Sequence, residues 1–197
     1  MKTATLSRCS ELIGKGVAEA MDGLSRMIGE EITVRSFGLK RISIAEMPEL
    51  LGGPDVEVVG IYVPSSGSAK SDILLTCGPR TARAFVDLLM GRRRGTTRSF
   101  GEMERSALEE MANVVGSLFL NAVADEAGLY LRPSPPSLVI DMAGAVLDVV
   151  AANAALTRDE AFVAETTFHV ASRDVSGLFF IVPSEDLLTT LQEGDAE

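Results

Sequence analysis

The chain has 197 residues, 46% of them hydrophobic, and a formal net charge of −10. This length and apolar content are sufficient for a single domain with a sizeable core. The negative charge makes nucleic acid and anionic membranes poor partners, because like charges repel. No stretch approaches the ~20 apolar residues of a membrane-spanning helix, and the N-terminal residues do not form a secretory signal. Two cysteines without a CxxC motif indicate reduced thiols, so we expect a cytoplasmic protein.

The first half of the chain predicts a long helix, several strands and a second helix. Apolar residues recur at helical spacing over about residues 5–28, and Gly29 follows as a C-terminal signal. Strand-like segments are expected at 31–37, 56–64 and 71–78, with turns at 50–55 and 64–72. A helix is expected over 79–91, because proline suits a first helical turn.

The second half begins after a short basic segment, residues 91–100, which contains four arginines. We expect an exposed linker here, since so short a basic run is usually solvated surface. Ser99 followed by Glu102 fits a capping box that starts a second long helix, over about 101–127. The predicted elements after it are a proline-rich connection, a segment at 137–150, strands at 161–171 and 177–183, and a closing helix at 184–193.

The two halves match each other when the sequence is shifted by 99 residues. Ser7 then aligns with Ser106, Glu11 with Glu110 and Gly29 with Gly128, and the segment 41–53 is roughly superposable on 137–150. The match predicts a pseudo-two-fold α+β domain, in which strands of both halves form one mainly antiparallel sheet with long helices packed on it. We expect one domain made of two repeats, about 1–94 and 99–197, joined by the basic linker.

One face of the second long helix is polar in an unusual way. At 100° per residue, one narrow stripe is formed by Ser106, Glu110, Asn113, Ser117 and Asn121. The opposite, apolar face is formed by Met111, Val115, Leu118, Phe119 and Ala122. A polar stripe is usually only the solvated side of a helix. Asparagine, however, is a weak helix former, and two of them in mid-helix carry a stability cost that lysine or glutamate would avoid.

The spacing of this stripe resembles the active-site signature of the CheC-type phosphatases, the CheC/CheX/FliY group of chemotaxis proteins. Ser106, three residues, Glu110, two residues, Asn113, twenty-two residues and Pro136 match all four fixed positions of that pattern. The internal repeat and the helix-first order of each half extend the resemblance to nearly the whole chain. It implies a phosphatase whose substrate is the aspartyl phosphate of a CheY-like response regulator.

The resemblance also implies roles for the residues of the stripe. Asn113 would orient the attacking water, because an amide can both accept and donate hydrogen bonds. Glu110 would dock the regulator through a charge pair with the lysine beside its phosphorylation site, and Ser106 would flank the site. Pro136 would shape the loop that follows the helix. The protein would need no cofactor and no metal of its own, since the regulator carries the Mg²⁺.

The first half departs from the pattern. Ser7 and Glu11 are present, but Gly14 stands at the asparagine position and Phe37 at the proline position. Glycine has no group that could orient water, so we expect a single active centre and a vestigial first site that keeps some ability to dock. Alternatively, Gly14 and Gly16 serve only to let helices pack closely.

Two other functions compete with phosphatase activity. Relatives of CheC can bind CheD, a deamidase of chemoreceptors, so the protein could be a non-catalytic adaptor. The middle domain of the flagellar-switch protein FliM shares the fold without the activity, although the pair of Glu110 and Asn113 argues against that function. His169, the only histidine, lies in a strand-like run and is expected on a sheet face, not in a metal or catalytic site.

Overall fold

The computed structural model describes residues 3–69, 71–153, 160–170 and 175–183, together with Leu187 and Thr189. The first half contains α1 (Thr3–Ile28), β1 (Ile32–Ser43), the 3₁₀ helix η1 (Ile44–Leu51), β2 (Glu57–Val63), β3 (Ser65–Gly67), β4 (Ser71–Cys77) and α2 (Pro79–Leu89). The second half contains α3 (Glu102–Ala127), β5 (Leu131–Pro133), β6 (Ser137–Met142), α4 (Ala143–Asn153), β7 (Glu160–Val170) and β8 (Val175–Pro183). The α+β class is therefore confirmed.

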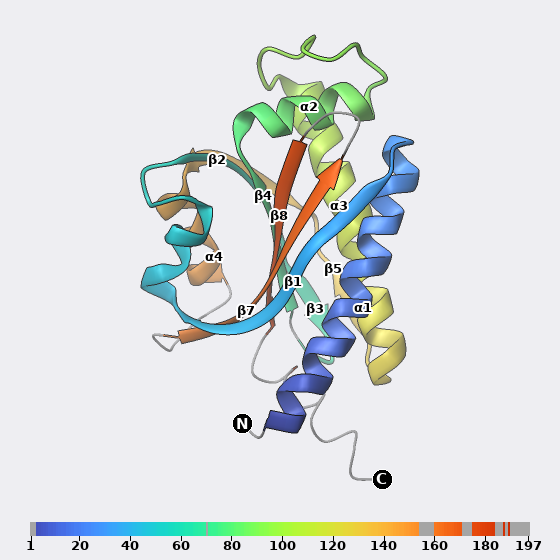
Figure 1. The fold of residues 1–197 in the computed structure, drawn as a ribbon, viewed down its shortest axis with the longest axis vertical. Coiled ribbons are helices and arrows are strands. Elements are labelled where there is room, and N and C mark those ends of the chain that lie inside the picture. Colours follow the sequence, from blue (N-terminus) through green and yellow to red (C-terminus); the bar gives the residue numbers. More distant parts are fainter. Residues whose placement is uncertain are drawn as a thin grey trace.

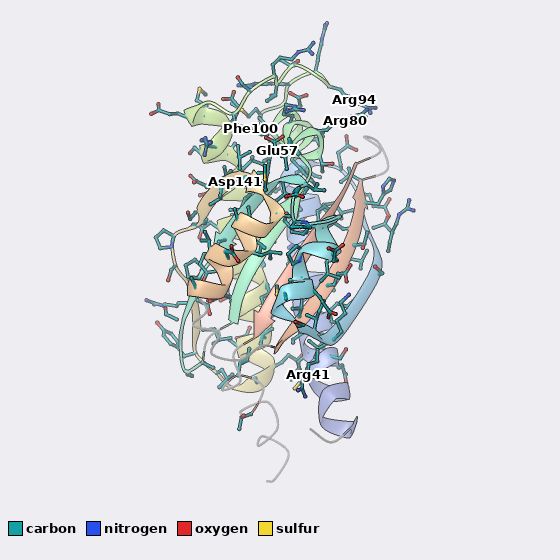
Figure 2. The ribbon with its side chains drawn as sticks, turned by 90° about the vertical axis from the view of Figure 1, so that its left-hand side faces the viewer. Arg41, Glu57, Arg80, Arg94, Phe100 and Asp141 are labelled. Carbon is teal, nitrogen blue, oxygen red and sulfur yellow. The ribbon has the colours of Figure 1, made fainter. Side chains whose placement is uncertain are left out.

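One six-stranded sheet, in the order β1-β7-β8-β4-β2-β6, forms the centre of the molecule, and all its neighbouring strands are antiparallel. Helices α1 and α3 lie side by side on one face, whereas η1 and α4 lie on the other (Figure 1). Figure 2 shows the second face, with η1 and α4 in front of the strands. The sheet thus separates two helical layers.

The inner strand β2, between β4 and β6, carries side chains into a separate apolar core on each face. Val59, Ile61 and Val63 belong to the larger core, under α1, α2 and α3. Val58 and Tyr62 alternate with them and pack in the smaller core, under η1 and α4. Burial on both faces explains why this strand has an almost continuous apolar sequence instead of alternating polar and apolar residues.

The arrangement of the elements follows the internal sequence match. Exchanging β1 with β6, β2 with β7, and β4 with β8 turns the order of the sheet into its own reverse. Helices α1 and α3 both have 26 residues and begin 99 positions apart. Each is followed by a glycine in the left-handed region, Gly29 with φ 68° and Gly128 with φ 65°. This is the topology that two related halves would give; the repeat boundaries remain a prediction.

Helices α1 and α3 run antiparallel and approach closely. A Cβ atom at Gly16 would lie 2.8 Å from the ring of Phe119, and one at Gly23 would lie 2.0 Å from Leu118 Cδ1. Glycine at position 16 therefore permits this helix spacing, because the ring of Phe119 is fixed in the core, whereas at position 23 only the end of the Leu118 side chain would have to move. The alternative role in helix packing is confirmed for Gly16.

Several local predictions were wrong. Residue Ser99 does not cap α3; the N-cap is Gly101, whose backbone N–H donates to Glu104 Oε2 at 3.0 Å. The expected turn at 64–72 contains β3, and the expected proline-rich connection contains β5, which pairs with it. The predicted closing helix at 184–193 lies almost entirely outside the described residues, of which Leu187 and Thr189 are helical.

The basic segment before α3 is more ordered than a solvated linker. The buried carboxylate of Asp87 accepts hydrogen bonds from the backbone N–H groups of Gly95 (2.6 Å), Thr96 (3.2 Å) and Thr97 (2.9 Å). Burial alone would raise the pKa of the Asp87 carboxyl, but the hydrogen bond from the Thr97 side chain and these backbone hydrogen bonds outweigh it and hold the pKa below its ordinary value. The loop is therefore fixed to α2 although most of its arginines are exposed.

Candidate active site

The start of helix α3 is held by a carboxylate that has two partners. Glu104 accepts the N–H of Gly101 with one oxygen and Arg92 Nη1, at 2.8 Å, with the other. The hydrogen bond from Arg92 is the main reason why the pKa of Glu104 lies below its ordinary value. Fixing the first turn in this way also fixes the direction in which the side chains of the following turns point.

The polar stripe of α3 faces away from the core. Ser106, Glu110 and Asn121 are exposed, and Asn113 and Ser117 are half-buried. The hydroxyl of Ser117 donates to the backbone oxygen of Asn113 at 2.6 Å, so it is satisfied within the helix. Ser106, Glu110 and Asn113 are thus the stripe residues of the motif that remain open to a partner.

The opposite face of α3 anchors the helix on the sheet. Met111, Val115 and Phe119 are buried in the larger core, as predicted. Leu118 and Ala122, which were predicted on the same face, are only half-buried, because they lie at its margin. A rigid helix therefore presents the stripe, which suits a site that must hold polar groups in fixed positions.

A shallow groove of about 430 Å³ lies over the first turns of α3. It is lined by Glu102, Met103, Ser106, Ala107 and Glu110. Met103 is 66% exposed, which is unusual for a large apolar side chain. Among the described residues, no side chain forms an ion pair or hydrogen bond with the Glu110 carboxylate or the Asn113 amide. These groups are consequently available to another molecule.

The structure also brings the distant proline of the motif toward the helix. Pro136 is half-buried and comes directly before β6. Two residues later, the N–H of Leu138 donates to Glu109 Oε1 at 3.3 Å. Glu109, the neighbour of Glu110 in sequence, thus ties the strand that follows Pro136 to α3. Sequence reasoning missed Glu109, because an acidic residue on a partly polar helix carries no local sign of a contact with a strand.

The corresponding position of the first half is arranged differently. Glu11 is exposed, but Gly14 lies under the half-buried ring of Phe37, and a Cβ atom there would be 3.2 Å from Phe37 Cε1. Ser7 lies in α1, and its side chain is outside the described part of the structure. Because α1 and α3 are antiparallel, Glu11 and Glu110 lie toward opposite ends of the helix pair (Figure 1).

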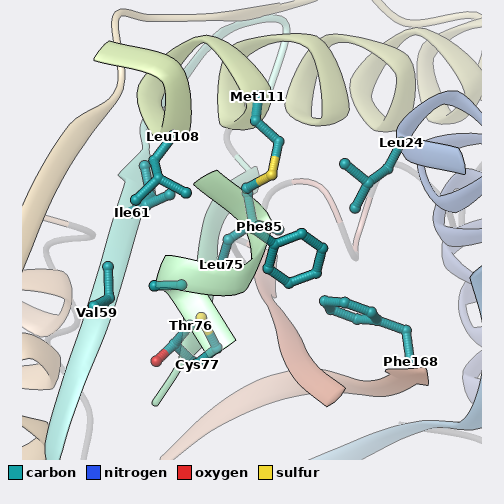
Figure 3. Close-up of a pocket in the computed structure, with 11 residues that line it drawn as sticks. Leu24, Val59, Ile61, Leu75, Thr76, Cys77, Phe85, Leu108, Met111 and Phe168 are labelled. Carbon is teal, nitrogen blue, oxygen red and sulfur yellow. The ribbon is translucent and has the colours of Figure 1, made fainter. Parts of the chain in front are cut away.

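The enclosed cavity of the core is not a second candidate for the active site. It has a volume of about 20 Å³, and its lining is apolar apart from Thr76 and Cys77 (Figure 3). Thr76 Oγ1 is buried without a hydrogen-bond partner, and burial raises the pKa of the Cys77 thiol to about 12. This space is too small for a substrate, so it is a packing feature of the core.

His169 lies half-buried on β7, opposite Thr33 of β1, in agreement with the expected sheet position. No group of three or more potential metal ligands occurs among the residues that the structure describes. None of the described helices is both long and apolar enough to span a bilayer.

Comparison with known proteins identifies relatives of the chain. No model of a protein family matches it. It is 26% identical to the CheY-P phosphatase CheC of Bacillus subtilis over 175 residues, which make up 87% of this chain and 84% of that protein. This chain is thus similar in sequence to a CheC-type chemotaxis phosphatase over most of its length. A CheC1 protein of Halobacterium salinarum is 25% identical over 134 residues, or 68% of each protein.

Solved structures share the CheC-like fold. FliY of Thermotoga maritima superposes with a TM-score of 0.76 and 18% identity, and the match covers 100% of this chain and 98% of FliY. CheX of Borrelia burgdorferi, solved as a CheX–CheY–BeF₃–Mg²⁺ complex, gives a TM-score of 0.57 and 15% identity, covering 89% of this chain and 99% of that one. The predicted CheC-like fold is therefore confirmed.

Proposed function

We propose that this CheC-like protein hydrolyses the aspartyl phosphate of a CheY-like response regulator, using one active centre on helix α3. The observation that carries the proposal is the pair of Glu110 and Asn113, one turn apart on the outward side of a well-anchored helix. The sequence relationship to a protein named as a CheY-P phosphatase supports the same reaction. We also propose that the protein acts on this regulator in the cytoplasm.

The reaction requires few catalytic groups from the phosphatase. An aspartyl phosphate is a reactive acyl phosphate: water attacks phosphorus, the aspartate carboxylate leaves, and inorganic phosphate is released. Positioning the water and stabilising the transferring group provide most of the catalysis. In this proposal, the carbonyl of Asn113 accepts a hydrogen bond from the water, and its NH₂ group donates toward the phosphoryl oxygens. In this proposal the regulator carries the Mg²⁺, which is supported by the CheX–CheY–BeF₃–Mg²⁺ complex of a protein with the same fold.

Docking is assigned to the groove beside Asn113. The Glu110 carboxylate is exposed and unpaired among the described residues, so a lysine of the regulator could pair with it at little cost in desolvation. Ser106 flanks this contact one turn earlier. Met103, exposed in the same groove, offers an apolar contact next to the charge pair. A charged group that fixes the register beside an apolar contact is a common arrangement in protein interfaces.

The first half is proposed to lack catalysis. Gly14 has no side-chain amide, and a Cβ atom there would already lie 3.2 Å from the ring of Phe37. Glu11 remains exposed and could still dock a partner. We propose accordingly that the domain consists of two repeats, about 1–94 and 99–197, of which only the second is catalytic; the reversible strand order of the sheet supports this division.

The test is direct. The protein is mixed with a phosphorylated CheY-like regulator and Mg²⁺, and phosphate release is compared with that of the regulator alone. We expect faster release at substoichiometric amounts of the protein, because a catalyst turns over. An unchanged half-life of the phosphorylated regulator would contradict the proposal. Binding to a CheD-type deamidase would then be the function to examine.

A further inference from the structure

Four arginines surround a hollow at the end of the molecule where α3 begins. Arg80 and Arg83 come from α2, and Arg94 and Arg98 come from the loop between α2 and α3; we call these four residues the arginine cluster. The hollow has a volume of about 590 Å³. Figure 2 shows Arg80 and Arg94 close together at this end. Such a concentration of positive charge is unexpected in a chain whose net charge is −10.

None of the four arginines forms an ion pair among the described residues. The ion pair of this loop joins Arg92 to Glu104 instead. Asp87 also lines the hollow and contributes one negative charge, but its oxygens accept the three backbone N–H groups of the loop and one carboxylate cannot balance four guanidinium groups. Arg83 lies over the ring of Phe100, with 6.0 Å between the guanidinium carbon and the ring centroid. The guanidinium groups therefore keep their hydrogen-bonding capacity for an anion.

Ordinary surface solvation does not explain this arrangement well. Four like charges around one hollow repel each other, and Arg80 stands in the first turn of α2, where the helix dipole disfavours a cation. At the same time, Asp87 fixes the loop, so that Arg94 and Arg98 are held beside α2 instead of spreading into solvent. The repulsion and the unfavourable helix position both lower the stability of the fold, yet the four charges are kept together. Such a local loss of stability is typical of a binding site.

We propose that the arginine cluster binds a multiply charged phosphate anion, such as the phosphate chain of a nucleotide or of an inorganic polyphosphate. The planar fork of a guanidinium group matches two phosphate oxygens at once. The volume lies within the range of small-ligand sites, and the concave shape favours a compact anion over an extended acidic peptide. No aromatic residue lines the hollow, so the phosphates and not a base would be recognised. The net charge of the chain disfavours a nucleic acid.

The experiment is a calorimetric titration of the full chain at physiological salt with tripolyphosphate, ADP and adenosine. We expect saturable binding of tripolyphosphate and ADP, and none of adenosine. Equal affinities for tripolyphosphate and ADP would indicate that only the phosphate chain is recognised, whereas tighter binding of ADP would indicate a nucleotide ligand. Both results support a phosphate site at the arginine cluster. The double variant Arg94→Gln/Arg98→Gln should bind roughly tenfold more weakly or worse, because two charge-assisted contacts are lost. The single variant Arg80→Gln on α2 should weaken binding in the same direction.

The control is a double variant that removes the same two positive charges outside the hollow. Arg35 and Arg132 are exposed and lie outside the hollow, so Arg35→Gln/Arg132→Gln should change the affinity by less than about twofold. Thermal unfolding verifies that all variants fold. The proposal is overturned by the absence of saturable binding, by equal losses in both double variants, or by a polyglutamate peptide that binds more tightly than tripolyphosphate. The last result would indicate an acidic protein segment as the ligand.

Discussion

Replacing Asn113 by alanine should separate the chemistry from docking. The amide of Asn113 has no partner among the described residues, so its removal leaves no buried polar group unpaired. The backbone oxygen of residue 113 still accepts the hydroxyl of Ser117, and alanine favours the helix by roughly 0.5 kcal/mol. The variant should therefore be at least as stable as the wild type. Loss of one group that contacts the transition state should raise the barrier by roughly 3 kcal/mol, about a hundredfold in rate.

Two measurements test this reasoning. Single-turnover phosphate release from the phosphorylated regulator should fall about a hundredfold, while affinity for the beryllofluoride-loaded regulator should stay nearly constant. The matched control is Asn121→Ala, the same substitution at an exposed position two turns further along the stripe. It should leave both quantities unchanged. Full turnover by a folded Asn113→Ala protein, or an equal loss in the control, would refute the assignment of the active site and favour the adaptor function.

Four further predictions concern other parts of the molecule. Glu110→Lys should abolish binding and turnover together, and added salt should partly restore them, because like charges then meet at the interface; titrations at two ionic strengths check this. Gly14→Ala should change turnover by less than about twofold and the free energy of unfolding by less than about 1 kcal/mol, because the higher helix propensity of alanine is opposed by its close contact with Phe37. Urea unfolding and the turnover assay measure these two quantities. Asp87→Ala should cost about 2–3 kcal/mol at pH 7 by leaving three N–H groups unpaired. Because the folded-state pKa of Asp87 is depressed, this contribution is present above about pH 4 and is lost as the pH falls through the folded pKa, so urea unfolding of wild type and variant should converge in acid. Thr76→Val should stabilise the protein by about 1 kcal/mol in thermal unfolding, since the hydroxyl is buried without a partner; a loss of stability would contradict this.

Helical periodicity was enough to find α1 and α3 almost to the residue. Both helices end before a glycine with positive φ, which is a local signal that the sequence contains. The start of α3 was harder, because Ser99 offered a plausible cap. The structure uses Gly101 instead, since Glu104 can reach back to it while also binding Arg92. Arg92 lies twelve residues before Glu104, beyond the range of a local capping pattern.

The candidate site was predictable only as far as a single helix determines it. A period of 3.6 residues places Ser106, Glu110 and Asn113 on one side, whatever surrounds the helix. The contact of Glu109 with the start of β6 depends on how the sheet packs on α3, which the spacing does not contain. The same holds for Asp87 and the basic loop, where exposure of the arginines was predicted but the fixed backbone beneath them was not.

If the proposed function holds, one pair of positions would decide which half is catalytic. Both helices keep the exposed glutamate, so the docking part of the motif does not distinguish the halves. In the second half, Asn113 stands free on the helix, and Pro136 precedes the edge strand β6. In the first half, Gly14 is covered by the ring of Phe37, which lies within the other edge strand, β1. A Cβ atom at position 14 would lie 3.2 Å from this ring, so a side chain there would require the ring to shift. In the proposed function, the missing amide at position 14 and the ring of Phe37 beside it would together leave the second half as the single active centre.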